Sequence, residues 1–122
     1  MSKKRLLIPT DSFLPKLDGA TSFLKEIIPR LENDFEITVV CPDYGKIEHD
    51  FNIEIRKFKP LNIYFGDIQP AFPNLRILNK EIKKADIVWI QGFGPIGLFS
   101  VILAKRIKKP TGVRGYQWIS HR

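Results

Sequence analysis

The order of its hydrophobic segments constrains the fold of this chain more than any other feature. Short apolar or alternating segments of strand length are interspersed with longer segments whose apolar residues recur at helical spacing. This order, strand-helix-strand-strand-helix-strand-helix-strand, predicts an α/β fold of the Rossmann-like, doubly wound type with a mostly parallel sheet. The predicted strands are 5–10, 35–40, 53–58, 85–90 and 111–114, and the predicted helices are 20–32, 75–84 and 96–107.

Two prolines and one apolar helix sharpen this prediction. Pro29 lies inside the first predicted helix and is expected to kink or shorten its last turns. Pro95 suits the first position of the third helix, which Pro110 follows. That third helix is apolar nearly all round, so we expect it to be deeply packed. Trp89, in the fourth strand, is expected to lie in the core.

A sheet of this kind binds ligands beyond the carboxyl ends of its strands. The loops 11–19, 41–45 and 91–95, and the chain from 115 onward, should therefore gather at one edge. A glycine before a helix lets backbone approach a ligand, and the free N–H groups there favour anionic oxygens. Asp18 and Gly19 fit that role, but taken alone an Asp-Gly pair is more often a tight turn and helix cap.

The chain carries 20 Lys+Arg against 13 Asp+Glu, a net charge of +7. This excess favours an anionic partner (a phosphorylated small molecule, a membrane surface or nucleic acid), or it reflects only the base composition of the genome. No apolar run reaches the roughly 18 residues of a membrane span, and the first one ends at Pro9, too early for a signal peptide. We therefore expect a cytoplasmic protein. The single Cys41 excludes an internal disulfide.

Three stretches carry a family resemblance. An apolar strand leads to Phe13-Leu-Pro-Lys-Leu-Asp-Gly19 at the start of a helix, and residues 31–42 pass from that helix into a Val-rich strand. Residues 84–110 read Lys-Ala-Asp-Ile-Val-Trp-Ile-Gln-Gly-Phe-Gly-Pro and continue to Leu-Ala-Lys-Arg-Ile-Lys-Lys-Pro. In this order and spacing they resemble the N-terminal domain of the retaining GT-B glycosyltransferases, family 4-like (group 1), which use nucleotide-activated sugars.

The resemblance implies an acceptor-side domain that faces a cleft. Its substrate-binding residues would be Asp18, Gly19, Ala20, Gly92, Phe93, Gly94, Arg114 and Gly115. Arg114 stands where the family often has a histidine, and an arginine pairs with phosphate but cannot act as a base. The resemblance therefore assigns no catalytic residue. Gln91–Gly97 would form a wall of the cleft, although a strand-to-helix turn needs Gly and Pro for geometry alone.

The resemblance further implies that residues 1–122 are a partial N-terminal domain that moves no sugar alone. The donor-binding C-terminal domain, with its Glu-x7-Glu stretch, is absent from these residues. The reaction would transfer a hexose from a nucleotide-sugar to a carbohydrate or lipid-linked acceptor, without a cofactor or metal. A homodimer through the truncated sheet edge at the fifth strand is also expected. The alternative is a non-catalytic binding or scaffold module that pairs with a separate catalytic chain or an anionic membrane.

Relatives that use lipid-linked acceptors touch the inner face of the membrane, and two basic clusters here offer such a surface. The clusters lie at Arg76–Lys84 and Lys105–Lys109, but such a pattern is more often a solvated helix face with ordinary core aromatics. The apolar anchors beside the first cluster would be Phe58, Leu61, Ile63, Tyr64, Phe65 and Phe72.

Several other classes are excluded. Gly92-Phe-Gly-Pro-Ile-Gly97 has the spacing of a dinucleotide-binding loop, but it follows the fourth strand and lacks the acidic residue about 20 positions on. There is no phosphate-binding G-x-x-x-x-G-K-[ST] loop, no zinc-ligand spacing and no acidic pair of a phosphoacceptor domain. The absence of a basic-aromatic motif argues against nucleic acid as the partner.

Overall fold

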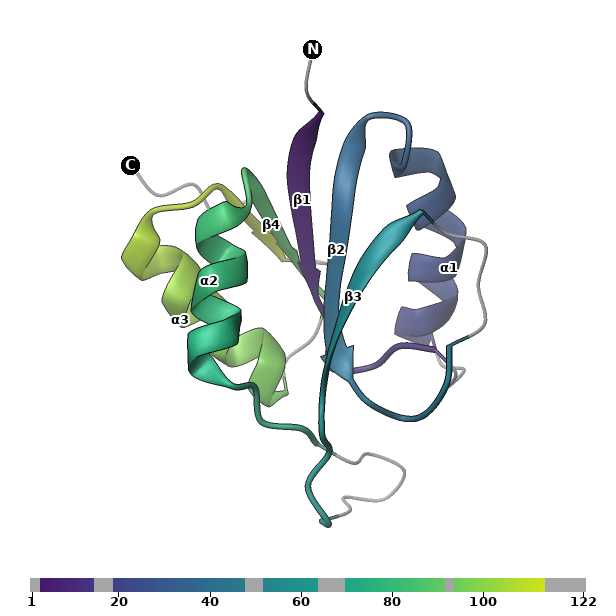
Figure 1. The fold of residues 1–122 in the computed structure, drawn as a ribbon, viewed down its shortest axis with the longest axis vertical. Coiled ribbons are helices and arrows are strands. Elements are labelled where there is room, and N and C mark those ends of the chain that lie inside the picture. The colour runs from purple at the N-terminus through teal and green to yellow at the C-terminus, as the bar shows by residue number, and fades with distance from the viewer. Residues whose placement is uncertain (1–2, 15–18, 48–51, 64–69, 92–93, 114–122) are drawn as a thin grey trace.

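The computed structural model describes residues 3–14, 19–47, 52–63, 70–91 and 94–113, and it shows one sheet between two helical layers (Figure 1). Helix α1 covers one face of the sheet, and helices α2 and α3 cover the other. The predicted α/β order is confirmed. The strands are β1 (Lys4–Pro9), β2 (Phe35–Pro42), β3 (Ile53–Phe58), β4 (Ile87–Ile90) and β5 (Thr111–Val113), and the helices are α1 (Gly19–Leu31), α2 (Leu75–Lys84) and α3 (Pro95–Ile107).

The five strands run parallel in the order β3-β2-β1-β4-β5. The chain builds outward from β1 to β2 and β3, and then returns to the other side of β1 for β4 and β5. The direction of winding thus reverses between β1 and β4, which is where sheets of this type bind ligands. The described part of the chain therefore has a Rossmann-like sheet with its switch point at the β1–β4 pair.

The alternation of side chains along the strands divides the core into two apolar clusters. Leu6 and Ile8 point to the α1 side, where they pack with Leu24 and Ile28 of the helix. Leu7 lies between them in sequence and belongs to the other cluster, on the α2 and α3 side. Both faces of β1 are buried, as the continuous apolar run in its sequence predicts for a central parallel strand.

The helices depart from prediction in two places. Helix α1 continues past Pro29 to Leu31, so the proline does not end it there. Helix α3 is not deeply packed on all sides, because Leu98 and Ile102 are 53% and 54% exposed. The prediction failed because α3 lies in an outer layer and turns only one face, that of Ile96 and Ala104, to the sheet.

The residues predicted as apolar membrane anchors differ in their exposure to solvent. Phe58 is buried in the core at the end of β3, so it is not available to a membrane. Ile63 and Phe72 are exposed, and the Phe72 ring meets the Phe99 ring edge to face at 6.3 Å. Trp89 is only partly buried, with its ring 5.7 Å from that of Phe23. Tyr64 and Phe65 lie outside the described residues.

Among the described residues, no helix is long and apolar enough to cross a membrane.

Candidate functional site at the carboxyl edge of the sheet

Strands β1 and β4 end side by side at the switch point. Their pairing begins at Leu6 with Ile87, and it continues until the Gln91 backbone N–H donates to the Pro9 carbonyl at 2.8 Å. Extending the same register sets Thr10 beside Gln91 at the carboxyl edge. Both side chains are polar and both are buried, at 0% and 5% exposure. Polar residues thus replace the apolar core at the point where the topology predicts a ligand.

The Gln91 side chain is the least satisfied group of this edge. Neither its amide nitrogen nor its amide oxygen has a hydrogen-bond partner among the residues that the structure describes. Burying an amide without a partner costs on the order of 1–3 kcal/mol, so native proteins seldom leave one this way. An unpartnered donor and acceptor in one buried side chain therefore indicate a place for an uncharged polar ligand group or an ordered water.

A chain of hydroxyls connects the end of β1 to the first turn of α1. The Thr10 hydroxyl donates to the Ser12 carbonyl at 2.7 Å, and the Ser12 hydroxyl lies 3.5 Å from that of Thr21. Thr10 and Thr21 are both fully buried. These bonds hold the loop after β1 against the start of α1 and so shape the wall of the edge next to Gln91. The sequence offered no signal for them beyond a Ser/Thr-containing loop.

The Asp11 carboxylate occupies the N-terminus of α3. Its two oxygens accept hydrogen bonds from the backbone N–H groups of Ile96 at 2.9 Å and Gly97 at 3.0 Å. The helix cap itself is Gly94, which has no side chain to cap with, so Asp11 takes that role from the other side of the switch point. A Cβ on Gly94 would lie 2.7 Å from the Asp11 carboxyl carbon, so any larger residue there would force the Asp11 carboxyl to shift.

Burial raises the pKa of Asp11 above its usual 3.8, and the backbone N–H groups of Gly97, Ile96 and Gly94 oppose that rise. Desolvation therefore outweighs the capping hydrogen bonds for the charged form. A carboxylate already fills the site at this helix end where an anion would bind, so an anionic ligand is disfavoured at α3.

No described acidic side chain caps the N-terminus of α1. Gly19 is exposed, a Cβ built on it would meet nothing within 4 Å, and the first turn of α1 holds no acidic residue. Of the predicted substrate-binding residues, Gly19 and Ala20 open this helix, and Gly94 packs against Asp11. The others, Asp18, Gly92, Phe93, Arg114 and Gly115, lie outside the described residues.

The carboxyl edge continues outward past the ends of β2 and β3. The Tyr44 hydroxyl reaches the Asp11 carbonyl at 3.5 Å, and Tyr44 also lines an open hollow of about 570 Å³ with Asp43 and Lys59. Cys41, at the end of β2, is fully buried, and burial raises the pKa of its thiol to about 12. The thiol is therefore neutral at physiological pH and is no nucleophile.

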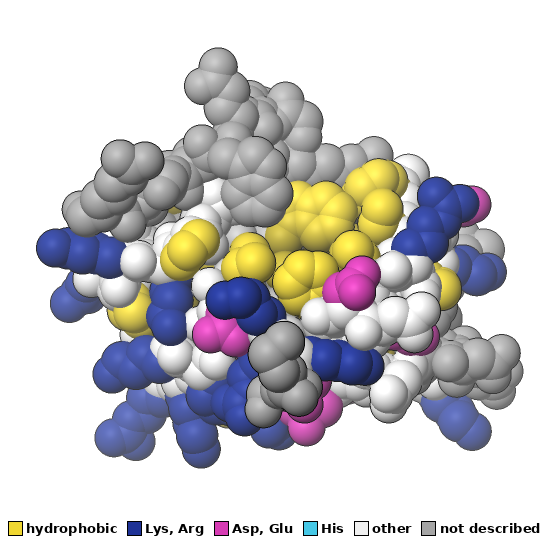
Figure 2. Space-filling view, turned by 90° about the horizontal axis from the view of Figure 1, so that it is seen from above, with side chains coloured by type: hydrophobic (Ala, Val, Ile, Leu, Met, Phe, Trp, Pro, Cys, Tyr) yellow, Lys and Arg dark blue, Asp and Glu magenta, His cyan; other side chains and the backbone are white. Residues whose placement is uncertain are grey.

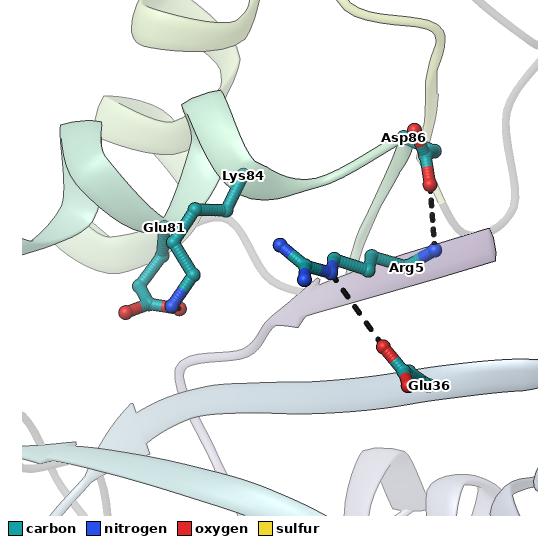
Figure 3. Close-up of polar contacts among 5 residues, drawn as sticks. All are labelled: Arg5, Glu36, Glu81, Lys84 and Asp86. Atoms are coloured by element: carbon teal, nitrogen blue, oxygen red, sulfur yellow. Dashed lines mark hydrogen bonds and ion pairs between the residues drawn. The ribbon is translucent and has the colours of Figure 1, made fainter. Parts of the chain in front are cut away.

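A second hollow, of about 610 Å³, lies at the opposite end of the sheet. Arg5, Glu36 and Lys84 belong to its lining, and Figure 3 shows them with their neighbours. The Arg5 guanidinium lies 3.5 Å from the Glu36 carboxylate, and the Arg5 backbone N–H donates to Asp86, beside the hollow, at 2.8 Å. Lys84 pairs with Glu81, whose carboxylate is only 4% exposed, at 3.6 Å. The basic residues Arg5 and Lys84 beside this hollow are each paired with a carboxylate, so they are less available to a charged ligand. We therefore place the candidate site at the carboxyl edge, although its hollow is slightly smaller.

Within the described residues, no group of His, Cys, Asp and Glu could hold a metal ion. A scan against models of known protein families and a search of curated proteins found no match for this chain. These comparisons therefore assign no family. The fold and the geometry of the edge define only the class of the protein, an α/β domain with a parallel, Rossmann-like sheet and polar residues at the switch point.

Proposed function

We propose that this chain is the acceptor-side domain of a retaining glycosyltransferase that moves a hexose from a nucleotide-sugar to a carbohydrate or lipid-linked acceptor. A sheet of this type hosts many activities, so the fold alone does not support one over another. The observation that carries the proposal is the buried, unpartnered Gln91 amide beside Thr10 at the switch point. An amide offers one donor pair and one acceptor, which suits the hydroxyls of a sugar.

The charge pattern of the edge supports a neutral acceptor on the Gln91 side. Asp11 closes the α3 N-terminus to anions, whereas no acidic side chain lies in the first turn of α1 as the structure describes it. Sugar hydroxyls would then contact Gln91 while any phosphate lies toward α1. The donor-binding half is supplied by another domain or chain in this proposal, so the described domain binds acceptor without transferring sugar.

Binding of free sugars tests the proposal directly. The backbone amide resonances of an isotope-labelled protein are followed by NMR during titration with a panel of neutral mono- and disaccharides. We expect shifts at Thr10, Gln91 and the first turn of α3, and we expect Gln91→Leu to abolish them. Thr38→Val, in the middle of β2 and beside the hollow near the amino ends of the strands, is the control and should bind as the wild type does. Shifts that appear elsewhere, or survive in Gln91→Leu, would refute the assignment.

A second candidate function, a binding module for an anionic membrane surface, is favoured by where the charge lies. Residues 75–109 hold eight Lys or Arg and two acidic residues, so they account for +6 of the net +7. Figure 2, which looks at the amino ends of the strands, shows Lys and Arg side chains gathered on the α2 and α3 side. The same layer exposes Leu98 and Ile102, which could enter the headgroup region.

Vesicle co-sedimentation distinguishes this module from the sugar-binding domain. Binding to phosphatidylglycerol vesicles and not to phosphatidylcholine vesicles supports it, provided that Lys105→Glu weakens binding and Lys25→Glu on α1 does not. Both lysines are exposed and both changes alter the charge equally, so only the layer differs. Equal weakening by the two variants would show that net charge, and not the α2–α3 layer, drives the association.

A further inference from the structure

Strand β3 forms one outer edge of the sheet. Its hydrogen bonds to the neighbouring strand show which of its backbone groups point outward, away from the sheet. The sheet order ends at β3, so one side of this strand pairs with β2 and the other pairs with no described strand. The Phe58 carbonyl accepts from the Asp43 N–H at 2.8 Å and therefore points toward β2. Because successive residues of a strand point to opposite sides, the backbone groups of Ile53, Ile55 and Lys57 point outward.

The side chains of β3 alternate between the two faces in the same regular way. Phe58 packs into the cluster on the α2 and α3 side, so Glu54 and Arg56 lie on that face as well. Ile53 and Ile55 pack, partly buried, with the cluster on the α1 side. Glu54 is exposed, and the Arg56 side chain is 51% exposed although it lies 3.4 Å from Glu81.

We infer that β3 pairs with β3 of a second copy of this chain, antiparallel and with Ile55 on the twofold axis. In that register Ile55 faces Ile55 of the partner, and the outward N–H and C=O groups of the two residues bond to each other. Ile53 and Lys57 then face each other in the same hydrogen-bonded manner on either side of the axis. All the outward backbone groups of these three residues find partners.

Charge complementarity selects this register. It sets Glu54 directly opposite Arg56 of the other copy, twice, at the non-hydrogen-bonded positions where side chains on facing strands come closest. If the two strands were shifted by one residue, the outward N–H and C=O groups of one copy would no longer face those of the other. If they were shifted by two residues, Glu54 would no longer lie opposite Arg56 in either pair. If no dimer formed, the same charged residues would instead protect an unpaired edge strand from aggregation. The two explanations are distinguished by whether the chain dimerises through β3.

Cysteine cross-linking tests the register. Residues facing each other in a hydrogen-bonded pair have Cα atoms about 5.5 Å apart, within the range of a disulfide. Ile55→Cys should therefore form a disulfide-linked dimer under mild oxidation. Ile53→Cys is the matched control, since it has the same residue type, strand and face. Its two copies would lie about 13 Å apart along the strand, too far to bridge. The native thiol of Cys41 is buried and contributes no background.

Sedimentation equilibrium of the unmodified chain gives the second measurement. We expect a concentration-dependent dimer whose dissociation constant rises about tenfold in Glu54→Arg, because two attractive pairs become repulsive. Mixing Glu54→Arg with Arg56→Glu should restore the dimer, since every facing pair is then of opposite sign, once circular dichroism shows both variants folded. A monomer at all concentrations, or equal cross-linking of Ile53→Cys and Ile55→Cys, would overturn the inference. A dimer in which Ile55→Cys fails to cross-link would also overturn it, in favour of another surface such as β5.

Discussion

Replacing Asp11 with alanine is the sharpest test of how the carboxyl edge is built. The substitution removes the acceptor for two backbone N–H groups of α3, at 2.9 and 3.0 Å, and Gly94 has no side chain to take its place. Loss of a helix cap costs about 0.5–2 kcal/mol, and hydrogen bonds to a charged group lie at the upper end of that range. The burial that raises the pKa of Asp11 returns part of this cost when the charge is removed. The expected loss in the free energy of unfolding is about 1.5 kcal/mol.

Urea unfolding followed by circular dichroism measures this loss as a lower midpoint at unchanged slope. Asp11→Asn keeps one acceptor oxygen and removes the buried charge, so it should lose less than half as much as Asp11→Ala. Asp34→Ala, at an exposed aspartate whose side chain bonds to none of the described residues, is the control and should change stability by less than about 0.5 kcal/mol. If Asp11→Ala proves as stable as the control, the carboxylate does not hold α3, and the account of the switch point fails.

Three further predictions concern the same edge. The pKa of Asp11 is raised in the folded protein, so its ionisation disfavours folding. As the pH rises from below 3.8 through the folded pKa, the wild type should therefore lose stability relative to Asp11→Asn, and a relative gain would show that the N–H bonds outweigh desolvation. Gly94→Ala should destabilise by about 1–3 kcal/mol in urea unfolding, but by much less in an Asp11→Ala background, because its Cβ would lie 2.7 Å from the Asp11 carboxyl. Cys41, with its pKa of about 12, should react with a disulfide reagent at pH 8 only as fast as the protein opens, and rapid labelling of the native state would contradict its burial.

The order of the elements was predictable because each depends on neighbouring residues. Apolar residues at helical spacing placed α2, and Pro95 at the first position placed α3. The exposure of α3 was not predictable in this way. Its apolar surface indicates burial on all sides, but only the position of the helix in an outer layer decides which of Leu98 and Ala104 is covered.

The candidate site was less predictable because its contacts join distant parts of the chain. Asp11 and Ile96 are 85 residues apart, and nothing local to either residue announces their bond. Gly19 and Gly94 do lie at the starts of α1 and α3. Gly94 makes room for the Asp11 carboxyl, and a pattern of glycines before helices does not predict such a partner. The unpartnered amide of Gln91 could be recognised only once the neighbouring strand was in place.

The two helix N-termini at the switch point differ in their described acidic side chains, and this difference limits how any ligand can bind. A ligand with a phosphate at α3 would have to displace Asp11 from two backbone hydrogen bonds and leave its carboxylate against another anion. The same phosphate at α1 meets no described acidic side chain in the first turn, and Gly19 leaves the backbone open. A neutral ligand faces no such choice, because the Gln91 amide can both donate and accept. Competition between a neutral sugar and inorganic phosphate therefore separates the two subsites: if the edge is built as argued, phosphate should shift the resonances of α1 and leave those of Gln91 to the sugar.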